Sequence, residues 1–103
     1  MIKVKTTLCD NKFVGIEIKG HANFAKKGSD IVCAGVSALG FALVGTLKSL
    51  NVPLTKESTK NKIHILLDVD NANEVQKSTV NLLILQTVIG IEQIKQQYKQ
   101  YFN

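Results

Sequence analysis

A histidine and a cysteine are the residues of this sequence whose types and spacing point to covalent chemistry. His21 and Cys33 stand twelve positions apart in the segment GHANFAKKGSDIVCAGVS, residues 20–37. A thiolate is a strong nucleophile, and an imidazole within reach can take the thiol proton and return it to a leaving amine. A cysteine in an apolar helix is, however, most often a small hydrophobe, and a histidine after a strand most often lies on the surface. The pair is therefore a candidate for nucleophilic catalysis, with a purely structural role as the alternative.

The residues before Cys33 predict the start of an apolar helix over residues 31–50. Ser29 or Asp30 is a suitable N-cap for it. With Asp30 as the cap, Cys33 occupies the third helical position, where unpaired amides and the helix dipole stabilise a thiolate and can hold an oxyanion. Asp30 then has two possible roles: it caps the helix, or it orients the imidazole of His21.

Other residues of the same segment could support such a site. Ser37 follows Cys33 by one helical turn and shares its face, so it either hydrogen-bonds to the site or is an ordinary helical serine. Lys26 and Lys27 lie in a loop with two glycines, and adjacent lysines are usually solvated charges. In this loop they would also touch a substrate if the loop covers the site.

The remaining candidates for chemistry are weaker. Cys9 lies at the end of a predicted hairpin, and His64 alternates out of phase with the apolar face of its strand, so both are expected to be structural or solvent-facing. The cysteines and histidines lack the short spacings of zinc sites, and the segment GFALVG lacks the lysine and hydroxyl of a phosphate-binding loop. We expect no metal and no cofactor.

Hydrophobic periodicity predicts four strands and two helices. Alternation predicts strands over 1–8 and 13–19, with Ile2, Val4 and Leu8 on one face of the first and Val14, Ile16 and Ile18 inward on the second. Pro53 ends the first helix; strands over 52–58 and 62–69 follow, the latter with Ile63, Ile65, Leu67 and Val69 on one face. A second long helix over 74–101 is capped by Asn71 or Asn73. The order predicts an α+β fold, a two-layer sandwich of a mostly antiparallel four-stranded sheet with two long helices on one face (β-β-α-β-β-α).

Length and composition restrict the class of protein. The 103 residues make a single domain, 1–103. No secretory segment begins the chain, so we expect free thiols in the cytoplasm. The uncharged run 31–47 has the minimum length of a membrane span, but its glycines favour a buried helix that a sheet, a second helix or another protomer approaches closely. The net charge of +5 fits RNA, a ribosomal partner or an anionic surface. All thirteen basic residues are lysine, which argues against sequence-specific nucleic-acid recognition.

The segment with His21 and Cys33 resembles the signature of the ribosomal-processing cysteine proteases, the Prp family. The resemblance covers the whole chain: a hairpin ending in Gly-His-Ala, a glycine-bearing loop, Asp-x-Val-Cys-Ala-x-Val-Ser, and a C-terminal helix ending GIEQIKQQYKQY. Gly35 is a departure, since alanine is more usual there.

The resemblance implies a function and its residues. His21 and Cys33 would form the catalytic dyad, with Asp30 and Ser37 in support. The substrate would be the short N-terminal extension of a large-subunit ribosomal protein of the L-twenty-seven family, and the protein a cytosolic homodimer. The loop between the dyad residues would be mobile and order around substrate; it comprises Gly20, Ala22, Asn23, Phe24, Lys26, Lys27, Gly28 and Ser29.

The alternative is a non-catalytic basic module that associates with the ribosome or RNA. It explains the lysines but leaves the clustering of His21, Asp30 and Cys33 without a reason.

Overall fold

The computed structural model describes residues 1–20 and 29–103, with the side chains of 1–20 and 31–103. The elements follow the predicted order. They are β1 (Lys3–Cys9), β2 (Lys12–Lys19), α1 (Ser29–Ser49), β3 (Leu54–Ser58), β4 (Ile63–Leu67) and α2 (Glu74–Gln97). Short 3₁₀ turns at Val69–Asn71 and Lys99–Tyr101 precede and follow α2.

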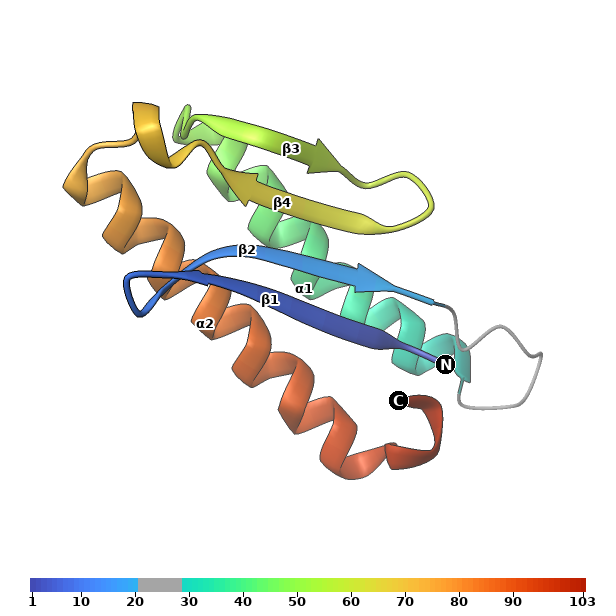
Figure 1. Cartoon of the computed structure of the whole chain (residues 1–103). Helices are drawn as coiled ribbons and strands as arrows, with labels where there is room; N and C mark the ends of the chain where they lie inside the picture. Colours follow the sequence, from blue (N-terminus) through green and yellow to red (C-terminus); the bar gives the residue numbers. More distant parts are fainter. Residues whose placement is uncertain (21–28) are drawn as a thin grey trace.

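The four strands form one sheet with the order β1-β2-β4-β3, and every neighbouring pair is antiparallel. Both helices lie on the same side of it (Figure 1), which confirms the two-layer sandwich. The core lies between the layers and contains the alternate residues of the two central strands, Val14, Ile16, Ile18, Ile63, Ile65 and Leu67. Helix residues that meet them include Val36, Leu43, Leu47, Val80, Ile84 and Ile91.

The β1–β2 hairpin is closed by two residues with left-handed backbone, Asp10 (φ 51°) and Asn11 (φ 64°). Such a pair is typical of the tight turn whose twist matches antiparallel strands. A register shift between Thr7 and Leu8 interrupts the alternation of β1. The prediction that Leu8 shares the face of Ile2 and Val4 is therefore wrong: Leu8 is 61% exposed, whereas Ile2 is buried.

Helix α1 ends in a Schellman motif. The amide of Val52 donates to the carbonyl of Leu47, and the amide of Asn51, whose φ is 55°, donates to that of Lys48. Near its middle, α1 packs so closely on β4 that a Cβ at Gly40 would collide with the side chain of Ile63. Ile31–Ser49 is long and apolar enough to cross a membrane by composition alone, with a mean hydropathy of 1.8. A core helix meets the same criterion, and α1 contributes its buried face to this core.

The start of α1 differs from the prediction. The helix includes Ser29 and Asp30, so the expected N-cap position of Asp30 is wrong and Cys33 is the fifth helical residue rather than the third. An α-helix leaves its first four amides without an intrahelical acceptor. In a helix that begins at Ser29, these spare amides precede Cys33 in the chain.

Helix α2 begins as predicted, with Asn73 as its N-cap. The Asn73 side chain accepts from the amide of Gln76, whose own side chain accepts from the amide of Asn73. Several elements are shorter than expected, and β3 begins at Leu54 rather than at residue 52. β4 ends at Leu67, so Val69 belongs to a 3₁₀ turn, and α2 ends at Gln97 before the turn at Lys99–Tyr101.

The two chain ends lie side by side (Figure 1). Ile2 forms an isolated parallel bridge with Phe102. The amide of Ile2 donates to the carbonyl of Tyr101, and the amide of Asn103 donates to the carbonyl of Ile2. The side chains of Ile2 and Phe102 are both buried. This contact holds the N-terminal segment against the end of the sheet that carries the candidate site.

Candidate active site

Cys33 lies in the first part of α1, half-buried, at the wall of a cavity of about 170 Å³. The cavity opens between α1, the start of β1, the end of β2 and the β3–β4 hairpin. Its apolar lining is formed by Ile2, Ile18, Val36, Phe41 and Ile63, and its polar lining by Ser37, Thr59, Asn61 and Lys62. A thiol at the edge of an apolar cavity can contact the backbone of a bound peptide while the cavity accepts an apolar side chain of that peptide.

Ser37 lines the same cavity as Cys33, as its spacing of one helical turn predicts. Asp30 belongs to α1 by its backbone, and its side chain lies outside the described residues. The first turn of α1 precedes Cys33, so its amides are the nearest helix-derived donors for an oxyanion. The catalytic roles of Ser37 and Asp30 remain predictions.

Gly20, the residue directly before His21, also lines the cavity. Its φ of +90° is a left-handed conformation, and a Cβ there would collide with the carbonyl oxygen of Met1. Only glycine lets the chain leave β2 in this direction while the N-terminus lies against it. His21 itself lies outside the described residues, as do Ala22, Asn23, Phe24, Lys26, Lys27 and Gly28 of the predicted cover; Ser29 is described by its helical backbone.

The β3–β4 hairpin supplies three lining residues that the sequence analysis missed. Thr59, Asn61 and Lys62 lie more than twenty positions from Cys33 in the chain and reach the cavity because β4 pairs with β2. The left-handed backbone of Asn61 (φ 68°) marks the hairpin turn. An asparagine in a polar turn predicts the turn, but no local pattern tells which site the turn will reach.

An ion pair links the cavity wall to the exposed face of the sheet. The Lys62 Nζ lies 3.1 Å from the Glu17 Oε2, and the His64 Nδ1 lies 3.9 Å from the same oxygen. The hydrogen bond from Lys62 is the main reason why the pKa of Glu17 is lowered from its usual 4.5. Burial acts in the opposite direction, and the charges of Lys62, His64 and Lys19 add to the lowering. At neutral pH the Glu17 carboxylate is therefore ionised and holds the Lys62 ammonium group in place.

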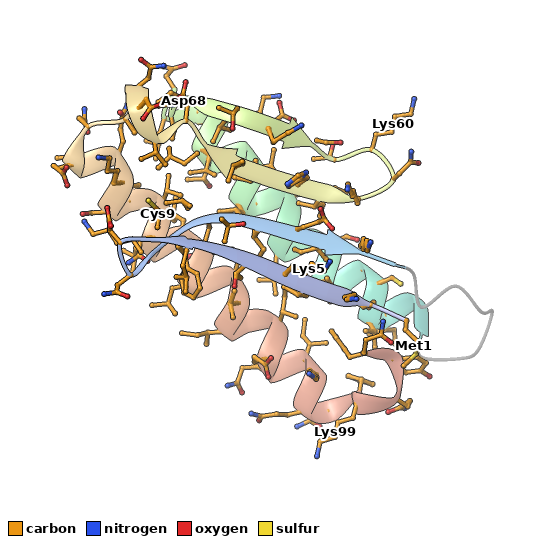
Figure 2. All side chains as sticks on the ribbon, viewed as in Figure 1. Met1, Lys5, Cys9, Lys60, Asp68 and Lys99 are labelled. Carbon is orange, nitrogen blue, oxygen red and sulfur yellow. The ribbon has the colours of Figure 1, made fainter. Side chains whose placement is uncertain are left out.

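Cys9 lies at the opposite end of the sheet from Met1, beside the hairpin turn of β1 and β2 (Figure 2). It is half-buried and packs against the core. Among residues 1–20 and 31–103, no three His, Cys, Asp or Glu side chains lie close enough to share a metal ion.

Known proteins resemble this chain in sequence along its whole length. The family described as "Cysteine protease Prp" matches residues 1–103. A ribosomal processing cysteine protease Prp from Staphylococcus aureus strain Mu50 is 33% identical over 106 aligned positions, covering 97% of this chain and 93% of that protein. The Prp of Bacillus subtilis strain 168 is 30% identical over 92 positions, covering 87% of this chain and 82% of that one.

Solved structures resemble it in fold. Prp from S. aureus in complex with a substrate peptide superposes with a TM-score of 0.74 at 23% identity, covering 100% of this chain and 96% of that chain. The same protein with a covalently linked product peptide gives 0.73 at 24% identity and the same coverage. The whole-length family match, the relatives in two genera and the shared fold agree, and this chain belongs to the Prp family of cysteine proteases.

Proposed function

We propose that this chain is a cytoplasmic cysteine endopeptidase that removes the short N-terminal extension of a large-subunit ribosomal protein of the L-twenty-seven family. The observation that carries the proposal is the position of Cys33 at the wall of an open cavity, with Gly20, the residue before His21, in the same wall. The cavity thus brings the candidate nucleophile together with the residue that precedes His21 in the chain.

The proposed reaction uses Cys33 and His21 in two stages. His21 takes the proton of the Cys33 thiol, and the sulfur attacks the scissile carbonyl carbon to give a tetrahedral oxyanion. The intermediate collapses to a thioester, and His21 gives its proton to the departing amine. His21 then takes a proton from water, which attacks the thioester to give a second tetrahedral intermediate. Collapse of this intermediate releases the new carboxyl end, and His21 returns the proton to the sulfur of Cys33.

Three features would support these steps. Amides of the first turn of α1 would donate hydrogen bonds to the oxyanion. Ser37, which lines the cavity, would hydrogen-bond to the substrate chain, and Asp30 would orient the imidazole of His21. The role of Asp30 rests on the family resemblance, whereas that of Ser37 also rests on its position.

The relatives' names and the cavity support the substrate class. Two curated relatives are named as ribosomal processing proteases, and a neighbour of the same fold binds a substrate peptide. The apolar lining, which includes Phe41 and Ile63, fits an apolar side chain beside the scissile bond.

The outer face of the helix layer supports a homodimer. Leu82 and Ile89 are each more than half exposed, and a groove between α1 and α2 is lined by Leu39, Leu83 and Ile89, among others. A second copy of this chain, offering the same apolar face, would remove this surface from water. Light scattering after size exclusion should give twice the chain mass, and Ile89→Lys should shift it to that of a single chain.

The decisive experiment is mass spectrometry of the host's ribosomal precursor after incubation with the protein. Wild type should release one N-terminal segment and Cys33→Ala none, while Cys9→Ala should cleave like wild type. No cleavage by a folded wild-type protein, with the extension present in the precursor, would contradict the protease and favour the ribosome-associated binding module.

A further inference from the structure

Three lysines form a row across the exposed face of the sheet, on the side away from the helices. Lys3 of β1 is directly opposite Lys19 of β2. The register between β2 and β4 pairs Ile18 with Ile63, so its continuation by one residue brings Lys62 opposite Lys19. Neighbouring strands lie about 4.8 Å apart. Lys3, Lys19 and Lys62, called here the lysine row, thus cross three strands at one level.

Further positive charge flanks the lysine row. Lys5 is two residues along β1 from Lys3 and so points to the same face. Lys60 lies in the β3–β4 hairpin, at the same end of the molecule as Met1 (Figure 2). All five lysines are exposed.

Among the side chains of residues 1–20 and 31–103, Glu17 is the carboxylate that pairs with the lysine row, and it binds Lys62. Glu57 is directed elsewhere, to Lys48 of α1, and Asp68 lies at the opposite end of the sheet (Figure 2). Within the part of the chain that the structure describes, no carboxylate forms an ion pair with Lys3, Lys5, Lys19 or Lys60. Within the described residues, the charges of these four lysines are therefore not offset by an ion pair.

Like charges directly opposite each other on two strands destabilise a sheet. Lys3 and Lys19 have this arrangement, and neither residue packs in the core. A bound anion would attract both ammonium groups and so offset the repulsion between them. A ligand with several negative charges spaced along an extended chain would fit this row of positive charges.

We propose that the lysine row, with Lys5 and Lys60, binds the phosphate backbone of single-stranded nucleic acid, with RNA as the occupant. Lysine contacts phosphate as a point charge, so a row of lysines fits a chain of phosphates, and the chain contains no arginine. Without arginine forks to read base edges, the binding is independent of sequence. An acidic protein segment is the competing occupant.

The lysine row also touches the candidate active site. Lys62 belongs both to the row and to the lining of the cavity beside Cys33. A nucleic-acid strand on the row therefore passes the mouth of the cavity, where it would recruit the protein to substrates that are themselves bound to RNA. The binding does not rest on the proposed proteolysis, because the Cys33→Ala chain retains every lysine of the surface.

Fluorescence anisotropy with a labelled 20-nucleotide oligouridylate tests the proposal on the full chain. Four phosphate contacts give a slope of about −2.8 in log K against log salt, a loss of about fiftyfold in affinity between 50 and 200 mM KCl. Lys3→Gln combined with Lys19→Gln should reduce the magnitude of the slope by about 1.4. A DNA strand of matched length should bind within about threefold of the RNA, because the contacts are to phosphates.

The matched control combines Lys95→Gln with Lys99→Gln, which removes the same charge from the end of α2 and the turn after it. Figure 2 shows Lys99 far from Lys60. This control should bind like wild type. An equal loss in both double variants, with thermal melts confirming that both are folded, would overturn the proposal, since net charge alone would explain the binding. Competition by a 20-residue polyglutamate as strong as that by RNA would assign the surface to an acidic protein instead.

Discussion

One cysteine lies at each end of the molecule, Cys9 in the sheet and Cys33 in α1, and the comparison between them separates a candidate nucleophile from a packing residue. Cys9 and Cys33 are both half-buried thiols that pack against the same core. Cys9 ends an edge strand beside a tight turn, whereas Cys33 lies early in a helix at the wall of an open cavity. The difference shows that cavity and helix position, rather than burial, identify the cysteine suited to chemistry.

The largest expected effect is the loss of the nucleophile. Cys33→Ala should reduce peptide cleavage by about 10⁴-fold or more, as expected when a covalent nucleophile is removed. Cys9→Ala should change the rate by less than about twofold, because its end of the sheet is remote from the cavity. Cleavage rates on a fluorogenic precursor peptide provide the measurement. Comparable losses in both variants would remove the distinction between the two ends.

The loss of the His21 imidazole is expected to have the next largest effect. His21→Ala should slow cleavage by about 10²- to 10⁴-fold and also slow the alkylation of Cys33 by iodoacetamide at neutral pH. His64→Ala removes a histidine from the outer face of β4 and serves as the control. Alkylation of Cys33 that is as slow as that of Cys9 in the wild-type protein would argue against an activated thiol.

The backbone at the cavity end can be tested through glycine. Gly20→Ala should destabilise the fold by about 1–3 kcal/mol, because alanine at φ +90° is strained and its Cβ meets the Met1 carbonyl. Gly45→Ala, in α1 with no atom within 4 Å of the added Cβ, should instead stabilise it by about 0.5–1 kcal/mol. Urea unfolding gives both values, and a Gly20→Ala chain as stable as wild type would contradict the described contact with Met1.

The smallest expected effect concerns Glu17. Its pKa is lowered, so its ionised form stabilises the fold above the ordinary value of 4.5, and this contribution is lost as the pH falls through the lowered pKa. Glu17→Gln should therefore lower Tm at pH 7 and have no effect below the lowered pKa. Glu92→Gln, on the exposed surface of α2, is the control. A Tm of Glu17→Gln that stays below that of wild type in acid would indicate a loss of packing rather than of charge.

The elements were predictable from the sequence where local patterns are strong. Alternation predicted the buried face of β2, and Asn71 or Asn73 was predicted as the cap of α2, of which Asn73 is the N-cap in the structure. Leu8 was placed wrongly because the register shift in β1 depends on pairing with β2, which alternation within one strand does not contain. The start of α1 was displaced because serine and aspartate are suitable both as caps and as first-turn residues.

The candidate site was predictable only where its residues are neighbours in the chain. Cys33 and Ser37 share a cavity because they are one helical turn apart. Phe41 follows Ser37 by one further turn of α1, whereas Thr59, Asn61 and Lys62 reach that cavity through the pairing of β4 with β2. These long-range contacts determine the shape of the cavity, and no spacing rule within the chain encodes them.

The bridge between Ile2 and Phe102 makes the backbone nearly a closed ring. A short linker between Asn103 and Met1 would complete it, and the exposed turn at Asp10 and Asn11 offers a place for new ends. Such a circular permutant would carry its free termini, and any fusion partner attached to them, at the end of the molecule remote from Cys33. By the same geometry, a fusion partner on either of the present ends emerges next to the wall of the cavity.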